Sequence, residues 1–403
     1  MQWICNQRGE NRSFEKFQKY IQLHNPDVTK LRYIHVAGTN GKGSTCNFLC
    51  DCLIEAGYKV GVFSSPHLVT HQDRICINHQ WIPDEDLLRL VNERQALWEK
   101  YHLSMFEIDF DMMILYFSRS HVDYVVLEVG LGGRLDATNV IENPLASVIV
   151  SIGMDHMERL GNTLEEIATE KAGIIKPNHL VISGETKGVT SQKIQQIAQQ
   201  KKAVLCWIEF PQKTKDVPVQ FVYREREYKL SSLADYQIHN AACAIETLYQ
   251  LREKGLVSIS NNQIQAGIER SQWAGRFDVV ANEPMVIVDG AHNEHGTDAL
   301  VGSINKLPHP CILVFAALKD KEYSAMIAKL KASVDEMIIT QFDFYRAATA
   351  TMLNTQSGLI VMEDWKQAIE LACQKAGKQG SVVVTGSLYF ISEIVEFYQN
   401  KRK

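Results

Sequence analysis

The segment from His35 to Thr45 constrains the fold of this chain more than any other, because an apolar run leads into a glycine-rich turn and then a helix. The three glycines of the turn let successive backbone N–H groups converge on an anion. The helix start that follows them adds the positive end of its dipole. The segment therefore predicts a buried strand, a phosphate-binding loop and a helix.

The residues beside these glycines suit a nucleotide. Lys42 can reach terminal phosphates, and Ser44 or Thr45 offers a hydroxyl to a phosphate-bound Mg²⁺. The common P-loop has four residues between its first glycine and Gly-Lys, with Ser or Thr directly after the lysine. Here two residues separate the first glycine from Gly41, and Gly43 follows Lys42. This spacing disfavours a generic GTPase or motor protein, and the complete set disfavours the alternative of a glycine turn without a ligand.

Length and charge exclude several other classes of protein. The 403 residues suggest two domains, or at most three, and a hydrophobic content of 45% is enough for a core in each. A net charge of −5 gives no bulk electrostatic reason to bind nucleic acid or an anionic membrane. There is no apolar run of about 18 residues, and the first residues do not read as a signal peptide. We expect a cytoplasmic protein without nucleic-acid or membrane partners.

The nine cysteines are expected to be reduced. Their number is odd, and no Cys-x-x-Cys pair is present, which disfavours a disulfide framework or a zinc site. Cys46 and Cys50 are four residues apart after the glycine loop, and small buried apolar contacts explain them best.

Apolar runs alternate with amphipathic stretches along the chain, which predicts a doubly wound α/β fold with a mostly parallel sheet. Short β-like pieces at Val204–Ile208 and Val219–Tyr223 predict a small antiparallel edge or subdomain, and a helix is expected over 237–252. The alternation restarts near residue 275, so we expect a P-loop nucleotide-binding domain over 1–273 and a smaller Rossmann-like α/β domain over 274–403. The predicted strands are 33–37, 60–63, 124–129, 146–152, 180–183, 285–288, 311–316, 336–340, 358–362 and 381–385.

Two polar groups follow predicted strands close to the glycine loop. Glu128 ends an apolar strand, where it suits a Mg²⁺ ligand, and the alternative is a salt bridge to Arg134 or Lys42. Asp155 and His156 follow the next strand along the chain and could complete or support a metal site. Because open parallel sheets bind ligands at the carboxyl ends of their strands, these groups are candidates for one site.

Three further positions are ambiguous from residue type alone. Lys171 lies on a predicted helix that ends by Pro177, and a solvated or salt-bridged lysine is the simplest interpretation. Asp289 ends a strand of the second domain and could accept from a ribose hydroxyl, whereas Arg276 could neutralise a phosphate. The alternative for this pair is a helix cap and a surface arginine.

Taken together, these segments resemble the folylpolyglutamate synthase/dihydrofolate synthase family, which belongs to the Mur ligases. The resemblance covers about residues 30 to 390. The segments that carry it are Gly38–Ser44, Ser64–Leu68, Glu128–Asn139, Asp155–His156, Glu170–Pro177, His239–Ala241, Gly275–Phe277, Asp289–Asn293 and Thr385–Tyr389.

The resemblance implies an ATP-dependent ligase. A folate or pteroate carboxylate would be phosphorylated by ATP, and the amine of L-glutamate would attack the acyl phosphate. The implied cofactor is Mg²⁺, with two ions expected, and a monovalent cation is left open. We expect a monomer. Two alternatives stay open, a Mur-type ligase with a different acceptor and a nucleotide-binding module without catalysis.

The resemblance also implies site residues, at the positions where this chain matches the family's motifs. Ser44, Glu128 and His156 match magnesium ligands, Lys171 matches a lysine carbamylated by CO₂ that would also bind metal, and His292 lies by the acyl phosphate. The catalytic candidates are Lys42, Lys171 and His292; the nucleotide contacts are Gly38, Thr39, Asn40, Gly41, Lys42, Gly43, Ser44, Thr45, Asn240, Arg276 and Asp289; the acceptor contacts are Ser65, Pro66, His67 and Asp136.

The chain departs from the family's pattern at a few places. The family frequently has glycine where this chain has Ala234, and it usually has proline where this chain has Ala274 and Glu294. None of these changes removes a chemical group. Asp73 stands where glutamate is more usual in the family, in the segment that follows Leu68. Ser65-Pro66-His67 slightly favours members that use dihydropteroate.

Overall fold

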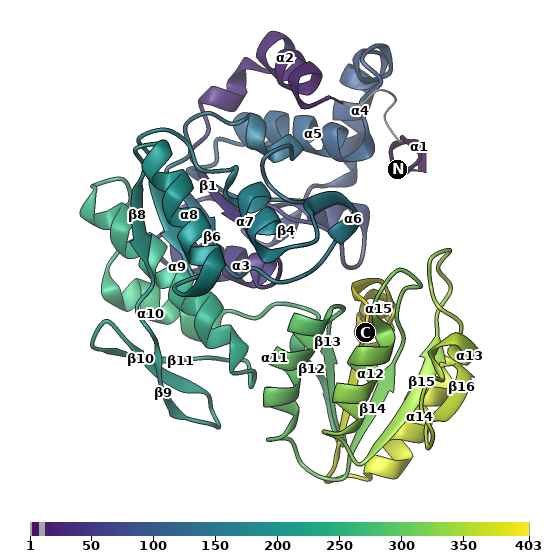
Figure 1. The fold of residues 1–403 in the computed structure, drawn as a ribbon. Helices are drawn as coiled ribbons and strands as arrows, with labels where there is room; N and C mark the ends of the chain where they lie inside the picture. The colour runs from purple at the N-terminus through teal and green to yellow at the C-terminus, as the bar shows by residue number, and fades with distance from the viewer. Residues whose placement is uncertain (1, 8–12, 403) are drawn as a thin grey trace. The chain divides into compact units, whose positions relative to one another are not determined.

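A computed structural model describes residues 2–7 and 13–402 of the chain (Figure 1). The chain folds into two compact units, which are described separately. The first comprises residues 1–212, 221–229 and 239–271, and the second comprises residues 213–220, 230–238 and 272–403.

The first unit is built on an eight-stranded sheet whose central strands are buried on both faces. Parallel strands with both faces covered read as continuous apolar runs, which is why the sequence located them well. The order is β4(Gln80–Trp81), β3(Ile75–Ile77), β2(Val60–Phe63), β5(Tyr124–Glu128), β1(Tyr33–Ala37), β6(Ala146–Ile149), β7(Leu180–Ser183) and β8(Val204–Trp207), with β3 and β4 antiparallel and the others parallel.

Helices cover both faces of this sheet (Figure 1). α5 packs against the core face that Val125 and Leu127 present, and α3 packs against β1, β2 and β5. Capping boxes start α5 at Ser104 and α7 at Thr163, where the side chain of each cap and a glutamate three residues later satisfy the first free N–H groups. The helices are α1(Gln2–Cys5), α2(Phe14–His24), α3(Lys42–Glu55), α4(Asp84–Lys100), α5(Met105–Arg119), α6(Met157–Leu160), α7(Leu164–Ala172), α8(Gly188–Gln200), α9(Tyr236–Glu253) and α10(Asn261–Arg270), with 3₁₀ turns η1(Pro26–Thr29), η2(His71–Arg74) and η3(Ala137–Val140).

One strand assignment from the sequence was wrong. Val204–Trp207 does not join a small antiparallel piece with the strand near Tyr223 but pairs in parallel with β7 at the edge of the large sheet. α8 supplies the crossover that a parallel pair needs. The segment near Tyr223 instead belongs to a three-stranded sheet of order β11(Arg226–Lys229), β10(Gln220–Tyr223) and β9(Gln212–Lys215).

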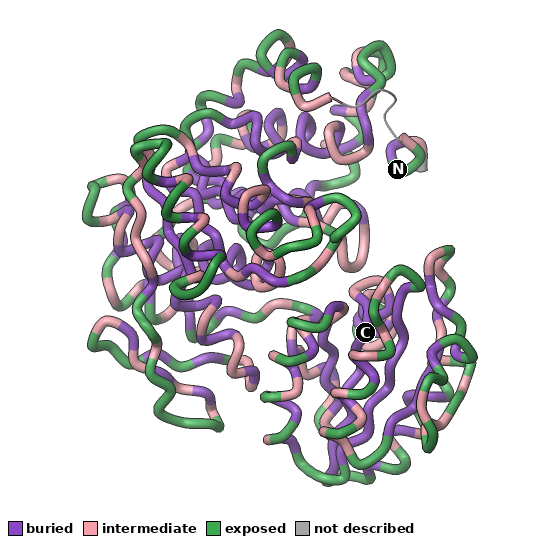
Figure 2. Tube along the Cα trace, viewed as in Figure 1, coloured by how far each residue is buried: buried purple, intermediate pink, exposed green. Residues whose placement is uncertain are grey.

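The second unit contains a six-stranded sheet whose two central strands are buried at every residue (Figure 2). Its order is β12(Arg276–Asn282), β13(Met285–Asp289), β17(Ser381–Thr385), β14(Cys311–Phe315), β15(Glu336–Gln341) and β16(Ile360–Asp364), and only the pair β12–β13 is antiparallel. Its helices are α11(Glu294–Ile304), α12(Tyr323–Lys331), α13(Ala350–Leu353), α14(Trp365–Ala376) and α15(Leu388–Arg402).

Other expectations from composition can be checked directly. All nine cysteines are free, and Cys46 and Cys50 are buried as expected. Among the residues that the structure describes, no helix is both long and apolar enough to cross a membrane.

Candidate active site

The predicted glycine loop connects β1 to α3 at the carboxyl edge of the central sheet. Gly41 caps α3 with φ of 81°, in the left-handed region that glycine adopts without steric cost. A Cβ atom added to Gly41 would lie 2.2 Å from Oδ1 of Asn240 on α9. The loop therefore requires glycine here both for its backbone conformation and for the approach of α9.

Lys42 folds back over the loop. Its Nζ atom donates to the carbonyl oxygens of Gly38 at 3.0 Å and Thr39 at 3.2 Å, and the side chain is partly buried. Ser44 and Thr45 are buried in the first turn of α3. The loop thus presents one lysine and two hydroxyl-bearing residues, as the sequence predicts for a phosphate site.

The loop after β6 braces the glycine loop. Thr39 N–H donates to Ser151 O at 2.6 Å, and the Thr39 hydroxyl both donates to Gly153 O and accepts from Gly153 N–H at 3.0 Å. The Ser151 hydroxyl donates to Asn40 O at 3.0 Å. These four bonds join loops that are more than a hundred residues apart, so the phosphate loop is held in place by the neighbouring strand.

Glu128 lies at the end of β5, opposite Val36 of β1, and is buried. Its Oε2 atom accepts a hydrogen bond from Ser65 N–H at 3.2 Å. Arg134, one of the two salt-bridge partners considered for Glu128, pairs with Glu170 at 2.9 Å. Glu128 therefore connects the edge beside the glycine loop with the Ser64–Leu68 segment.

Lys171 on α7 is buried, with only 4% of its surface exposed, which corrects the solvated or salt-bridged lysine that residue type alone favours. Its Nζ atom donates to Gly38 O at 3.0 Å, the same carbonyl that Lys42 contacts. Burial, followed by the nearby positive charge of Lys42, lowers the pKa of Lys171 to about 7. The fold brings an amine that is readily neutral to the glycine loop.

Asp155 and His156 lie in the loop between β6 and α6. His156 begins α6 with φ of 50°, and its side chain is 48% exposed. Asp155 Oδ1 accepts from the backbone N–H of His156 at 2.9 Å. Within residues 2–7 and 13–402, no group of three or more His, Cys, Asp or Glu side chains is arranged to hold a metal. Of the metal ligands expected from the resemblance, only Glu128 and His156 belong to these four residue types.

The segment expected to contact the acceptor carries buried polar groups. His67 Nδ1 lies 3.3 Å from Nη2 of Arg74, and burial, then this cation, lowers the pKa of His67 to about 4. Asp73, the departure noted in the sequence, accepts backbone hydrogen bonds from residues 68, 69 and 70 through Oδ2. Its role here is to hold the turn that follows Ser65-Pro66-His67.

The Asp136 carboxylate accepts hydrogen bonds from residues of its own loop. Oδ2 accepts from Leu131 N–H at 2.8 Å, and Oδ1 accepts from both the N–H, at 3.0 Å, and the hydroxyl, at 2.6 Å, of Thr138. The Gly130 backbone N–H also interacts with this carboxylate, so donors of the loop itself occupy its roughly four acceptor positions.

In the second unit, three predicted site residues lie where β12 begins and β13 ends. Asp289 is buried and accepts from Tyr236 Oη at 2.5 Å, Phe277 N–H at 2.9 Å and Ala291 N–H at 2.9 Å, while burial raises the pKa of its carboxyl. A Cβ on Gly290 would lie 2.8 Å from Nη1 of Arg276. His292 Nδ1 lies 2.8 Å from the carbonyl oxygen of Gly290. Asn293, not Asp289, caps α11.

Comparisons with known proteins agree with this geometry. Residues 36–248 match the Mur ligase middle domain, and residues 275–388 match the Mur ligase glutamate ligase domain. The chain is 38% identical to the dihydrofolate synthase/folylpolyglutamate synthase of Bacillus subtilis over 94% of this chain and 92% of that protein. It is 35% identical to the Escherichia coli protein of the same name over 91% of this chain and 86% of that protein.

The chain belongs to the dihydrofolate synthase/folylpolyglutamate synthase family. It is an ATP-dependent ligase of the class that adds glutamate to folates, which confirms the resemblance, the fold class and the enzyme class expected from the sequence. The structure of E. coli FolC in complex with DHPP and ADP has 31% identity and a TM-score of 0.89, covering 100% of this chain and 97% of that one. A bifunctional synthase with Mn, AMPPNP and L-glutamate bound has 28% identity and a TM-score of 0.87, covering 99% and 97%.

Sequence reasoning missed two polar groups near the glycine loop of this family member. His35 is fully buried in β1, and its Nε2 atom lies 2.9 Å from the Thr138 hydroxyl. Glu185 accepts from Ile152 N–H at 2.7 Å and from the Thr190 hydroxyl at 2.6 Å, bracing the loop after β6. A histidine inside an otherwise apolar strand was the available signal for the first.

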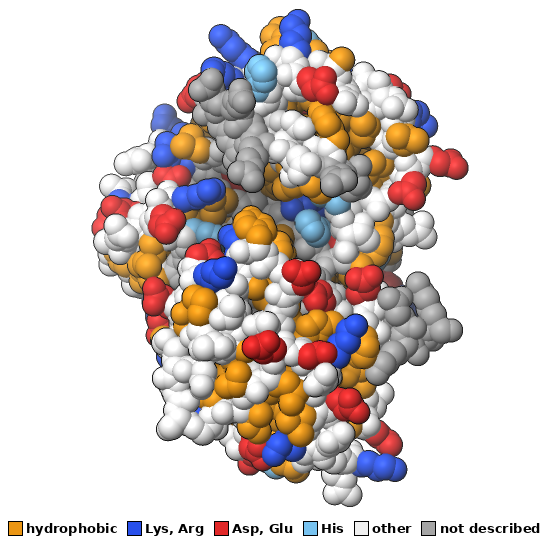
Figure 3. All heavy atoms as spheres, turned by 90° about the vertical axis from the view of Figure 1, so that its right-hand side faces the viewer, with side chains coloured by type: hydrophobic (Ala, Val, Ile, Leu, Met, Phe, Trp, Pro, Cys, Tyr) orange, Lys and Arg blue, Asp and Glu red, His pale blue; other side chains and the backbone are white. Residues whose placement is uncertain are grey.

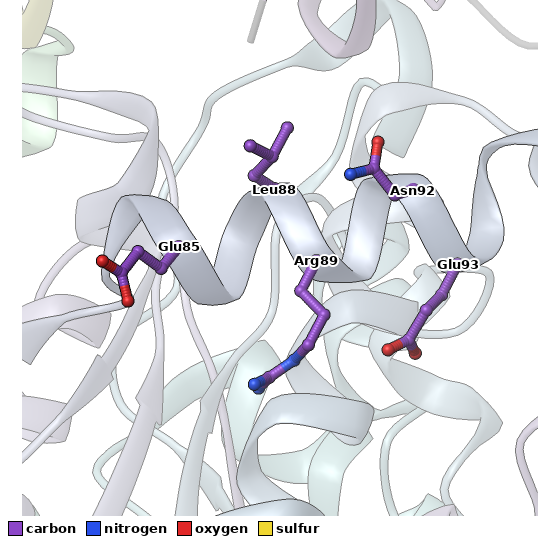
Figure 4. A pocket seen from close by; sticks show the side chains of 5 residues that line it. All are labelled: Glu85, Leu88, Arg89, Asn92 and Glu93. Carbon is purple, nitrogen blue, oxygen red and sulfur yellow. The ribbon is translucent and has the colours of Figure 1, made fainter.

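One face of the surface carries charges of both signs (Figure 3), and a hollow lies over α4. On the face that Figure 3 shows, Lys and Arg side chains are interspersed with Asp and Glu, without a patch of one sign. A surface hollow over α4 is lined by side chains of that single helix (Figure 4), and none of the predicted site residues contributes to it. The lining side chains are Glu85, Leu88, Arg89, Asn92 and Glu93.

Proposed function

We propose that this ligase joins L-glutamate to dihydropteroate, to tetrahydrofolates, or to both, as a cytoplasmic monomer. The observation that carries the proposal is the convergence of the Lys42 and Lys171 amines on the Gly38 carbonyl, both at 3.0 Å, beside a glycine loop. At such an edge Lys42 supplies positive charge and the glycine loop supplies backbone donors where phosphates bind. We further propose that residues 1–273 form the ATPase part and residues 274–403 the glutamate ligase part.

The reaction has two displacement steps. A carboxylate oxygen of the acceptor attacks the γ-phosphorus of ATP, the bond to the β,γ-bridging oxygen breaks, and ADP leaves. The deprotonated amine of L-glutamate then attacks the acyl carbon, and phosphate leaves as the amide forms. Phosphoryl transfer requires positioning and charge neutralisation more than covalent help from the protein. Lys42 and the loop N–H groups would supply both.

The donor set beside the loop fits magnesium. Ser44 and Glu128 offer buried oxygen ligands, which this hard cation prefers, and His156 and Lys171 complete the proposed set. When bound, Mg²⁺ would neutralise phosphate charge. We propose two such ions, and a requirement for a monovalent cation is testable by adding KCl to the same assay.

We propose that Lys171 is carbamylated. Its neutral amine would attack CO₂ and lose a proton, forming a carbamate anion with two oxygen ligands. Burial and a pKa lowered to about 7 support this, because only the uncharged amine is nucleophilic.

We assign the remaining predicted residues by motif. Asn240 would contact the adenine side of ATP, Arg276 its phosphates and Asp289 the nucleotide, with His292 by the acyl phosphate. On the acceptor side, Asp136 and the loop that it holds by hydrogen bonds would contact the pterin. The Ser65-Pro66-His67 segment lies against Glu128 through the Ser65 N–H bond, which supports an acceptor site beside the nucleotide.

Phosphate release tests the proposal. Purified protein with Mg·ATP and L-glutamate should release phosphate when dihydropteroate or tetrahydrofolate is added, and not without an acceptor. Release with dihydropteroate marks a dihydrofolate synthase, bifunctional if tetrahydrofolate also works. Turnover only with a UDP-linked muramyl acceptor, or ATP binding without turnover of any acceptor, would contradict the proposal.

A further inference from the structure

A chain of buried hydrogen bonds joins the central strand to the proposed acceptor site. His35 and Thr138 are fully buried, and Asp136 is nearly so. His35 Nε2 lies 2.9 Å from the Thr138 hydroxyl, which in turn lies 2.6 Å from Asp136 Oδ1. The three side chains come from β1, η3 and the residue that caps η3, so the chain crosses from the sheet into the loop.

The direction of each bond follows from donor chemistry. An ionised carboxylate only accepts, so the Thr138 hydroxyl must give its proton to Asp136. The same hydroxyl can then only accept from His35, which requires the proton of the imidazole to be on Nε2. His35 Nδ1 is buried without a hydrogen-bond partner, which agrees with a nitrogen that carries no proton.

The surroundings keep His35 neutral. Burial, followed by the nearby positive charge of Lys176, lowers the pKa of His35 to about 3. The Lys176 amine itself donates to Asn139 O at 2.8 Å, which fixes the end of the same loop. The imidazole therefore acts as a permanent single donor and not as a proton shuttle.

We propose that His35 is a positioning residue for the acceptor: through Thr138 it orients Asp136, the carboxylate that holds the loop proposed to line the acceptor site. This inference rests on the proposed function, because it requires this loop to contact the acceptor. Without the His35 donor, the Thr138 hydroxyl is free to rotate away from Asp136, and the carboxylate loses one of its two contacts with Thr138.

Steady-state kinetics test this role. His35→Phe keeps the ring but removes the donor, and it should raise KM for the acceptor about tenfold, the worth of about one hydrogen bond. KM for ATP and kcat should change less than about twofold. His35→Gln, which restores an N–H donor, should recover most of the loss. Ile34→Val is the matched control for a small change in the core of β1 and should leave both KM values unchanged.

A double-mutant cycle separates positioning from general damage. Thr138→Val should raise the acceptor KM as His35→Phe does, and the double variant should be no worse than either single variant, because both break one chain. Equal losses toward ATP and acceptor, or additive losses in the double variant, would overturn the inference. If His35→Phe does not fold, the Thr138→Val and Thr138→Ser pair gives the same comparison.

Nitrogen-15 NMR of labelled histidine separates this inference from the proposed function. The neutral tautomer with the proton on Nε2 is expected in the unliganded protein. A proton on Nδ1, or a charged His35 at pH 6, would refute the inference even if the enzyme uses folates. If no pterin acceptor supports turnover, the proposed function is refuted and, with it, the role of His35 toward the acceptor.

Discussion

The glycine turn after β1 and the turn after β13 both lie at the carboxyl end of a buried parallel strand, but different parts of the chain hold them. The turn after β1 is bonded to Gly153 and Lys171, which are 114 and 133 residues away from their partners. The turn after β13 is held around Asp289, whose backbone donors Phe277 and Ala291 are 12 and 2 residues away.

This difference shows two ways to pre-organise a polar turn. The conformation of the first turn depends on the whole sheet, so this turn forms only when several strands have assembled correctly. The second depends on its own hairpin and on a few distant donors, because Tyr236 Oη donates to Asp289 from 53 residues away and Gly386 N–H donates to Ala291 O. Damage to the first should spread through the unit, whereas damage to the second should be limited to the groups around Asp289.

The largest effect is expected from Lys42→Ala. The lysine contacts only carbonyl oxygens of the loop, so its removal should leave the fold intact while glutamate-dependent ADP formation falls by at least about 10³-fold. The exposed Lys254→Ala is the control. Normal turnover in Lys42→Ala, with an unchanged melting temperature, would contradict the assignment of this loop.

Lys171→Ala should reduce activity by about 10²-fold, through loss of a metal-binding carbamate. Added propionate should restore part of the activity, because it supplies a carboxylate to the vacated space. Rescue should be absent in Lys42→Ala, which is the matched control. Full activity of Lys171→Ala without any additive would contradict the proposed role of the carbamate.

Gly41→Ala measures the coupling of the first turn to α9. Gly41 and Gly188 have φ of 81° and 79°, but only at Gly41 would a new Cβ meet other atoms. Gly188→Ala should therefore cost about 1 kcal/mol of unfolding free energy for its backbone strain. Gly41→Ala should cost at least about 1 kcal/mol more and weaken ATP binding. Equal losses in chemical denaturation would show that Asn240 does not restrict the loop.

Tyr236→Phe should have the smallest effect. It removes one of three donors to the buried Asp289, which should lower the free energy of unfolding by about 1–2 kcal/mol. Tyr345→Phe, at an exposed position of the same unit, should change it by less than about 0.5 kcal/mol. A loss in Tyr236→Phe above about 4 kcal/mol would mean that the second turn is not local.

Buried strands could be predicted from the sequence because their apolar runs are continuous. The expected strands 33–37, 60–63, 180–183 and 381–385 match the structure residue for residue. The edge strands β9 and β12 were not predicted in this way. β9 consists of Gln-Lys-Thr-Lys and is exposed throughout, and β12 has register shifts and a left-handed residue at Phe277, so neither shows a regular apolar pattern.

The site was less predictable than the strands, because its residues meet only in the folded chain. The glycine loop is local and was evident from its spacing. The burial of Lys171 depends on α7 packing beside that loop, and the contact of Asn240 with Gly41 depends on a helix almost 200 residues further on. No local pattern encodes either contact, and for Lys171 only the family resemblance indicated a special role.

The packing of α3 has a consequence for synthesis on the ribosome. α3, which begins at Lys42, packs against α10, whose last residue is Arg270, and Thr45 donates to Asn240 O. A nascent chain therefore carries the glycine loop long before the helices that cover α3 have been translated. Because elongation proceeds at about 5–20 residues per second, that interval lasts on the order of ten seconds or more. During this time the emerging segment depends on chaperones or on its own partial sheet, and a chain truncated before residue 240 is expected to lack a working nucleotide loop.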